Sequence, residues 1–235
     1  MSGLTRKQTI TEGCRPEAPL PWRVSRGDSP GREEMKGRGY RISGWGLGGF
    51  SLIELLIAIA ISGIVLGAVS SLFIMQNKSY SIQEQVAEMQ QNARAAMDIM
   101  TREIRMAGYD PTGLANASIV SATSNSINLT QDTNGDGDTA DANENITYSL
   151  YTSGWIQKIG RNTGGGNQPV VEHIQALTFA YYDSDGNTTA ILANIRQIEL
   201  TITARTANPD PDYTTNDGYR TCTLTSLITP RNLAY

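Results

Sequence analysis

The pattern of apolar and polar residues divides the 235-residue chain into regions with different periodicities. From Phe50 to Met75 most residues are apolar, and Glu54 is the only ionisable side chain. A run of this length can cross about 30 Å of hydrocarbon as an α-helix. The pattern therefore predicts a hydrophobic helix over residues 50–76.

The helical pattern continues after this run but becomes amphipathic. Apolar residues recur at spacings of four and three, at Ile82, Val86, Met89, Ala93, Met97, Met100 and Ile104. Gly108, followed by Pro111, ends the pattern. We expect one continuous helix of about 87 Å from Phe50 to Ala107, at about 1.5 Å per residue. Its second part, residues 77–107, should pack its apolar stripe on a globular domain.

Residues 108–235 change to short segments with a period of two. Strands are predicted over residues 126–130, 145–151, 155–160, 176–182, 195–204 and 221–228. The clearest alternation places Ile198, Leu200 and Ile202 on one face and Glu199 and Thr201 on the other. Together with the helix, these segments predict an α+β fold in which an antiparallel sheet packs on the striped half of the helix.

Charge and cysteine content narrow the functional classes. The net charge is −4, with an excess of Lys and Arg in residues 1–49 and an excess of Asp and Glu afterwards. The acidic balance of residues 50–235 argues against nonspecific nucleic-acid binding. Because Cys14 lies in a segment that we expect to be removed, we expect no intramolecular disulfide. Cys222, within an alternating segment, is expected to be a small buried residue.

The N-terminal region reads as a leader rather than as part of the working protein. Residues 1–34 show neither helical nor strand periodicity, and Met35 begins a short basic stretch directly before the apolar run. We therefore expect Met35 to be the true start. A secretory signal would be cut after its apolar region. Here the plausible cut precedes it, so residues 1–49 would be removed and the apolar segment kept.

The segment G-F-S-L-I-E, residues 49–54, resembles the processing site of type IV prepilins. That resemblance implies cleavage by prepilin peptidase between Gly49 and Phe50, N-methylation of Phe50, and a type IV pilin-like fold. The helix end QQNARAAMDIMTREIRMAGYDP and the closing LITPRNL resemble the PilW-type minor pilins. The resemblance is strong over residues 48–70 and 90–111 and thin over 112–220.

The resemblance also gives roles to residues of the apolar run. Glu54 would pair with the N-terminal amine of a neighbouring subunit in a filament; the alternative is a glutamate that reaches the cytoplasmic interface of an isolated helix. Gly63 and Gly67 form a G-x-x-x-G, which permits close helix packing. They are also the expected place of local unwinding in a filament. The alternative is that small residues are simply common in membrane helices.

An acidic loop follows the first strand. Asp132, Asn134, Asp136 and Asp138 match the start of a calcium loop, and Glu144 stands one residue after the usual twelfth position. Two interpretations remain open, a Ca²⁺ site and a solvated Asp/Gly turn. The stretch DSDGN, residues 183–187, is interpreted as a hairpin turn.

The sequence contains no recognisable catalytic set, and its single histidine, His173, is interpreted as a structural or surface residue. We expect a non-enzymatic minor pilin that needs no cofactor, apart from the Ca²⁺ considered above. Its expected partners are other major and minor pilins, prepilin peptidase and the inner-membrane assembly platform, with residues 108–235 periplasmic and later on the filament. The alternatives are a J-like minor pseudopilin of type II secretion and a calcium-dependent tip adhesin.

Overall fold

The computed structural model describes residues 8–10 and 51–233. The main helix, α1, runs from Leu52 to Met106 and confirms the long N-terminal helix. The chain forms two compact units whose boundary lies within α1, between Ser79 and Tyr80. That boundary is close to the change from apolar to amphipathic sequence that predicted a division after residue 76.

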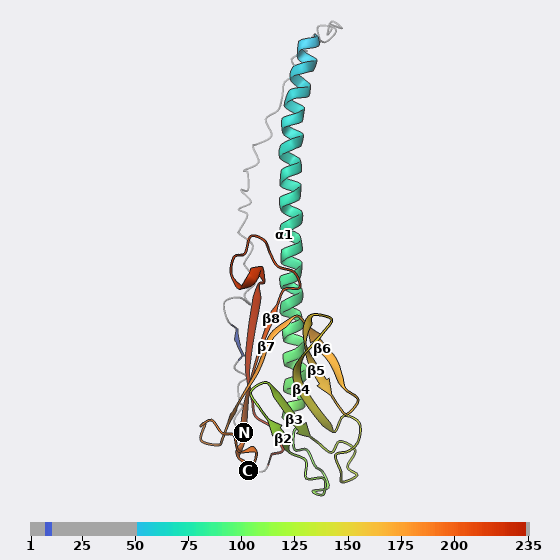
Figure 1. Cartoon of the computed structure of the whole chain (residues 1–235), viewed down its shortest axis with the longest axis vertical. Helices are drawn as coiled ribbons and strands as arrows, with labels where there is room; N and C mark the ends of the chain where they lie inside the picture. The colour runs from blue at the N-terminus through green and yellow to red at the C-terminus, as the bar shows by residue number, and fades with distance from the viewer. Residues whose placement is uncertain (1–7, 11–50, 234–235) are drawn as a thin grey trace, which may run out of the picture. The chain divides into compact units, whose positions relative to one another are not determined.

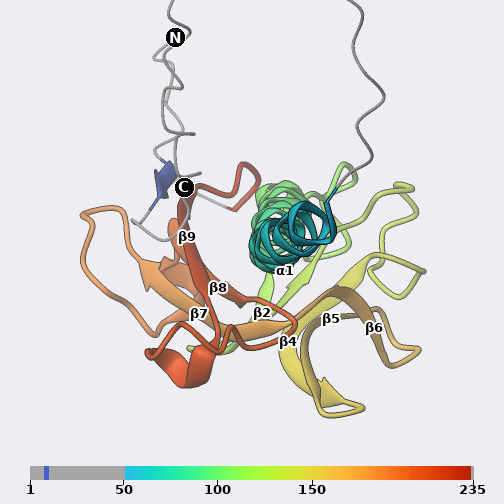
Figure 2. The same ribbon diagram turned by 90° about the horizontal axis from the view of Figure 1, so that it is seen from above.

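The unit that contains Tyr80–Tyr235 is built from the second part of α1 and two antiparallel sheets. The five-stranded sheet has the order β2 (Ile119–Ala122), β3 (Ser126–Thr130), β4 (Asn145–Ser153), β5 (Ile156–Asn162), β6 (Asn167–Glu172). The four-stranded sheet has the order β1 (Gln8–Ile10), β9 (Thr221–Ile228), β8 (Gln197–Arg205), β7 (Ile174–Tyr182). Two 3₁₀ turns, η2 (Leu192–Asn194) and η3 (Asn216–Gly218), flank β8. These strands lie around one side of the helix (Figures 1 and 2).

The predicted stripe of the helix forms part of the core. Met89, Ala93, Met97, Met100 and Ile104 are all buried, and Val86 is partly buried against them. The inward face of β8 is buried at the three predicted positions, Ile198, Leu200 and Ile202, and also at Ala204. The helix and the sheets therefore share one hydrophobic core, which confirms the α+β fold.

The structure has two sheets where the sequence predicted one. The chain passes from the first sheet to the second at His173, between β6 and β7, with a positive φ of 59°. The His173 carbonyl accepts a hydrogen bond from the Arg205 backbone N–H at 2.9 Å, which fixes the corner to β8. Short hydrophobic alternation cannot reveal such a switch, because both sheets use the same period of two. The placement supports a structural role for His173.

Strands β2 and β6 were not predicted, and neither was β1, in a region expected to lack regular structure. β1 pairs antiparallel with β9, residue Gln8 opposite Ser226 and Ile10 opposite Leu224. Three residues are too few to show an alternation. Their assignment depends instead on main-chain hydrogen bonds to the edge of an existing sheet.

The expectation for Cys222 is half right. The residue is buried, as its place in β9 predicted. It is also disulfide-bonded, so the expectation of an unpaired thiol is wrong. That expectation assumed that residues 1–49 were absent, whereas residues 8–10 of this region form β1, which pairs with β9. Cys14 itself lies outside the described residues.

Candidate functional site

The first part of α1 exposes its apolar side chains. None of the 18 residues in its most apolar window is buried within the chain, and the helix is long and apolar enough to cross a membrane. Typical exposed fractions are 75% for Ile64 and 63% for Phe73. Burying a side chain of this size is worth about 1.5–3 kcal/mol. This surface is therefore suited to a partner that residues 8–10 and 51–233 do not supply, such as lipid or other helices.

Glu54 caps the beginning of α1. One of its carboxylate oxygens accepts a hydrogen bond from the Ser51 backbone N–H at 3.0 Å, and the Ser51 hydroxyl accepts one from the Ile53 N–H at 3.4 Å. Ser51 thus acts as an N-cap through the N–H of Ile53, and Glu54 returns a bond to the Ser51 N–H, as the glutamate of a capping box does. Gly49 and Phe50, the predicted cleavage residues, lie outside the described residues.

The two glycines of the apolar segment make no close approach within the described chain. A Cβ added at Gly63 or at Gly67 would meet no atom within 4 Å. Both lie within the regular α-helix, where the Ser62 and Ser71 hydroxyls donate to the carbonyls of Ala58 and Gly67. Nothing inside the subunit requires glycine here, so close packing and unwinding stay predictions about contacts with other chains.

The opposite end of α1 is held by the last residues of the chain. Gly108 has a φ of +78°, and a Cβ there would lie 2.9 Å from the Leu233 side chain and 3.0 Å from the Asn232 carbonyl oxygen. The Arg231 backbone N–H donates to the Arg105 carbonyl at 3.1 Å. The two stretches that resemble PilW-type pilins, one at the helix end and one near the C-terminus, thus contact each other. This contact explains why a glycine closes the helix.

A polar cluster joins the helix to the five-stranded sheet. The Tyr148 hydroxyl donates to Glu103 at 2.5 Å, and Arg161 Nε contacts both Glu103 oxygens at 3.1 Å. A second nitrogen of Arg161 donates to the Asn143 side chain. Burial, followed by the neighbouring Glu103 carboxylate, raises the pKa of Tyr148. This cluster was not predicted. Its one indication in the sequence was Glu103, an acid directly before Ile104 of the apolar stripe.

The acidic loop between β3 and β4 brings three carboxylates together. Oxygens of Asp136, Asp138 and Glu144 lie within 4.8 Å of one another; the two aspartates are exposed and Glu144 is buried. Asp132 lies outside this group, and its two oxygens accept the backbone N–H groups of Gly135 and Gly137. These bonds shape the loop, and a direct contact of Asp132 with a cation stays a prediction.

Asn134 bridges two acids of the same loop. Its amide nitrogen donates to Asp136 at 2.9 Å and to Asp141 at 2.7 Å, while its oxygen accepts the Asp136 backbone N–H. The Asp136 carboxylate, followed by burial and the other acids nearby, raises the pKa of Asp141. Negative charge is therefore crowded around the loop.

The other acidic stretch, residues 183–187, is a turn. The Asp183 backbone N–H donates to the Asn187 carbonyl, and one Asp183 oxygen accepts the N–H groups of Asp185 and Asn187. Those bonds lower the pKa of Asp183. Tyr182 and Thr188 form an antiparallel bridge across these residues, as expected for the hairpin turn interpreted from the sequence.

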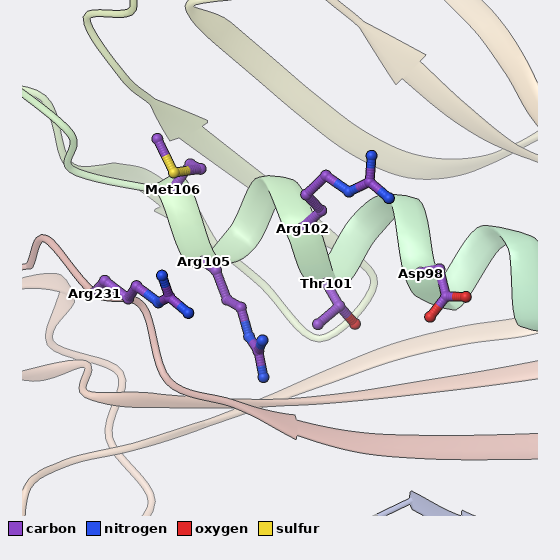
Figure 3. Close-up of a pocket in the computed structure, with 6 residues that line it drawn as sticks. All are labelled: Asp98, Thr101, Arg102, Arg105, Met106 and Arg231. Atoms are coloured by element: carbon purple, nitrogen blue, oxygen red, sulfur yellow. The ribbon is translucent and has the colours of Figure 1, made fainter. Parts of the chain in front are cut away.

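An open pocket with a volume of about 420 Å³ lies at the C-terminal end of α1. It is lined by Asp98, Thr101, Arg102, Arg105, Met106 and Arg231. Figure 3 shows Arg102 and Met106 on one side of the helix and Thr101 and Arg105 on the other. The arginines do not converge on one point, so the pocket is not assigned as an anion site.

Comparison with known proteins gave matches to two family models and to a solved structure. Residues 82–221 match the model described as prepilin peptidase-dependent protein B, and residues 48–70 match the prokaryotic N-terminal methylation motif. The chain is similar to a type IV-like pilin from Thermus thermophilus at 15% identity and a TM-score of 0.43, over 62% of this chain and 98% of the other. A comparison with curated proteins found no match.

Proposed function

Because the chain belongs to the prepilin peptidase-dependent protein B family, we propose that it is a minor pilin of the PilW type that takes part in type IV pilus assembly, priming or tip formation. It is a pilin-like protein with an N-terminal methylation motif, and such families are structural and non-enzymatic. Prepilin peptidase would cut between Gly49 and Phe50. The mature chain would then begin at Phe50 with Glu54 as its fifth residue.

The observation that carries the proposal is the exposed apolar surface of α1 with one carboxylate in its first turn. Before assembly, lipid would cover the surface, and the basic stretch before it favours a cytoplasmic N-terminus. After extraction by the inner-membrane assembly platform, helices of other major and minor pilins would replace the lipid. The same side chains would thus serve as a membrane span and as filament core.

Glu54 is proposed to set the axial position of the subunit when it moves from lipid into the filament. A carboxylate at membrane depth costs at least about 3 kcal/mol. In the subunit, the Ser51 N–H offsets part of this cost. In a filament, the positive amine of a neighbour's first residue is a stronger partner, since hydrogen bonds between charged groups are roughly twice as strong as neutral ones. The carboxylate therefore favours an axial position at which such an amine lies beside it.

The test is the pair of variants Glu54→Ala and Glu54→Gln, expressed in a cell that assembles the pilus. Glutamine keeps an oxygen that can accept the Ser51 N–H but has no charge. Both variants should be cleaved and methylated normally and should be missing from purified filaments. Normal incorporation of Glu54→Gln would show that helix capping, rather than charge pairing, is the role of Glu54.

A J-like role in type II secretion predicts the same processing and the same helix packing. Co-purification distinguishes this role from that of a minor pilin in a type IV pilus. Capture of the mature chain with pilus subunits supports the proposal, and capture with type II pseudopilins alone contradicts it.

A further inference from the structure

The carboxylate group in the acidic loop contains an unsatisfied buried atom. The Glu144 side chain is fully buried, and one of its oxygens, Oε1, accepts bonds from the Thr133 backbone and hydroxyl and from the Asn134 N–H. Its other oxygen, Oε2, is buried and has no hydrogen-bond partner in the described chain. A buried acceptor without a partner destabilises the folded chain, and a charged one does so more strongly. A bound ligand would give this oxygen the partner that it lacks.

The surroundings of Glu144 indicate that this ligand carries a positive charge. Asp136 and Asp138 place carboxylate oxygens within 4.8 Å of a Glu144 oxygen, and both aspartates are open to solvent. Three acids at this separation repel one another in the absence of a cation. Asp141, held through Asn134, adds a further negative charge beside them. A cation entering from solvent would be attracted by all four acids.

We infer that the loop of residues 132–144 binds one Ca²⁺ ion through Asp136, Asp138 and Glu144. Oxygen ligands alone, from carboxylates on a flexible loop, suit Ca²⁺, which accepts six to eight oxygens at variable angles; Mg²⁺ requires near-octahedral geometry. Asp132 shapes the site through Gly135 and Gly137, and water or main-chain oxygens would complete the coordination. Of the five ligands expected from the sequence, Asp136, Asp138 and Glu144 are acids with oxygens within 4.8 Å of one another.

The ion would order the chain next to the helix end. A Cβ at Gly137 would lie 3.4 Å from the Leu114 side chain, and the Asp132 backbone N–H donates to the Tyr109 carbonyl at 2.6 Å. The loop therefore packs on the segment that follows α1. Ca²⁺ binding should stabilise this surface, whether the chain is a pilin or a pseudopilin, so the inference does not depend on the filament.

The experiment is calorimetric titration of the full chain in detergent, after treatment with a chelator, with CaCl₂ and separately with MgCl₂. Ca²⁺ should bind saturably at one site, with a dissociation constant of about 1 mM or lower, as for extracellular modules. The thermal unfolding temperature should rise with the same concentration dependence. Mg²⁺ should bind at least about tenfold more weakly.

The variants Asp138→Asn and Glu144→Gln remove one ligand charge each, and Asp185→Asn is the control in the other acidic turn. The two loop variants should weaken Ca²⁺ binding by about tenfold or more, and the control should leave it unchanged. Asp138 is exposed, so its variant should keep the native near-ultraviolet circular dichroism spectrum. Absence of saturable binding up to about 10 mM Ca²⁺ would overturn the inference. So would binding by both loop variants that is as tight as binding by the wild type.

Discussion

The two parts of α1 have the same backbone conformation but opposite relations to the rest of the chain. In the first part, residues 52–79, the large apolar side chains are exposed, for example Leu72 and Ile74. In the second part, Met97, Met100 and Ile104 are at most 1% exposed. The described residues leave the apolar surface of the first part uncovered, whereas the second part is buried against the sheets. The following substitutions test this difference, from the largest expected effect to the smallest.

Truncation of a buried isoleucine should have the largest effect. Ile104→Ala removes atoms from the shared core and leaves a cavity, which should lower the free energy of unfolding by about 2–5 kcal/mol. The matched variant Ile64→Ala, at a 75% exposed position of the same helix, should leave it unchanged. Urea unfolding of the detergent-solubilised chain, followed by circular dichroism, measures both. Equal destabilisation by the two variants would contradict the division of the helix.

Substitution of the glycine after the helix should come next. Gly108→Ala adds a methyl group at a positive φ and 2.9 Å from Leu233, so we expect about 1–3 kcal/mol of destabilisation. Gly113→Ala is the control, because Gly113 also has a positive φ but no atom within 4 Å of an added Cβ. The difference between the two variants in thermal unfolding measures the contact between the helix end and the C-terminal residues.

The polar cluster should give a smaller, pH-dependent effect. Tyr148→Phe removes the hydrogen bond to Glu103 and should cost about 1 kcal/mol at neutral pH. Burial raises the pKa of Tyr148 above its ordinary value of 10.0, so the unfolded chain releases this proton first as the pH rises. Stability contributed by Tyr148 is therefore fully present below pH 10 and lost above it.

Unfolding of the wild type and Tyr148→Phe between pH 8 and 11 tests this assignment, with Tyr80→Phe, an exposed position, as the control. The loss of stability above about pH 10 should be smaller in Tyr148→Phe than in the other two chains. Burial also raises the pKa of Tyr181, so part of the loss should remain. An unchanged pH profile in Tyr148→Phe would contradict the role given to its hydroxyl.

Removal of the cap should have the smallest effect. Ser51→Ala deletes the hydroxyl that accepts the Ile53 N–H, at a cost of about 1 kcal/mol limited to the first turn. Amide hydrogen exchange in detergent should become faster at Ile53 and Glu54, while global unfolding stays the same. Faster global unfolding or destabilisation of the sheets would show that the two parts of the helix are coupled.

Much of the fold could be predicted from periodicity. The helix and the strands at residues 126–130 and 221–228 lie where the pattern placed them, because an amphipathic element on a core must repeat at the period of its own backbone. The edge strands β1, β2 and β6 escaped prediction, since short strands at the edge of a sheet bury little and carry weak alternation.

Some of the candidate sites could likewise be predicted from the sequence, and others could not. Glu54 could be predicted from the sequence, because one carboxylate in an apolar run is evident without a structure. The acidic loop could be predicted from the spacing of its Asp and Asn residues. The cluster of Glu103, Tyr148 and Arg161 could not be predicted from the sequence. These residues are far apart in the chain and meet only when β4 and β5 pack on the helix.

By itself, the sequence determined the long helix, its change of character near residue 77 and the methylation motif at its start, because these are local patterns of apolar residues and charge. Only the tertiary structure decided that two sheets share the helix, that Leu233 lies against Gly108, and that oxygens of Asp136, Asp138 and Glu144 lie close together. Those features depend on distances between residues remote in sequence, which chain packing sets and local propensity does not.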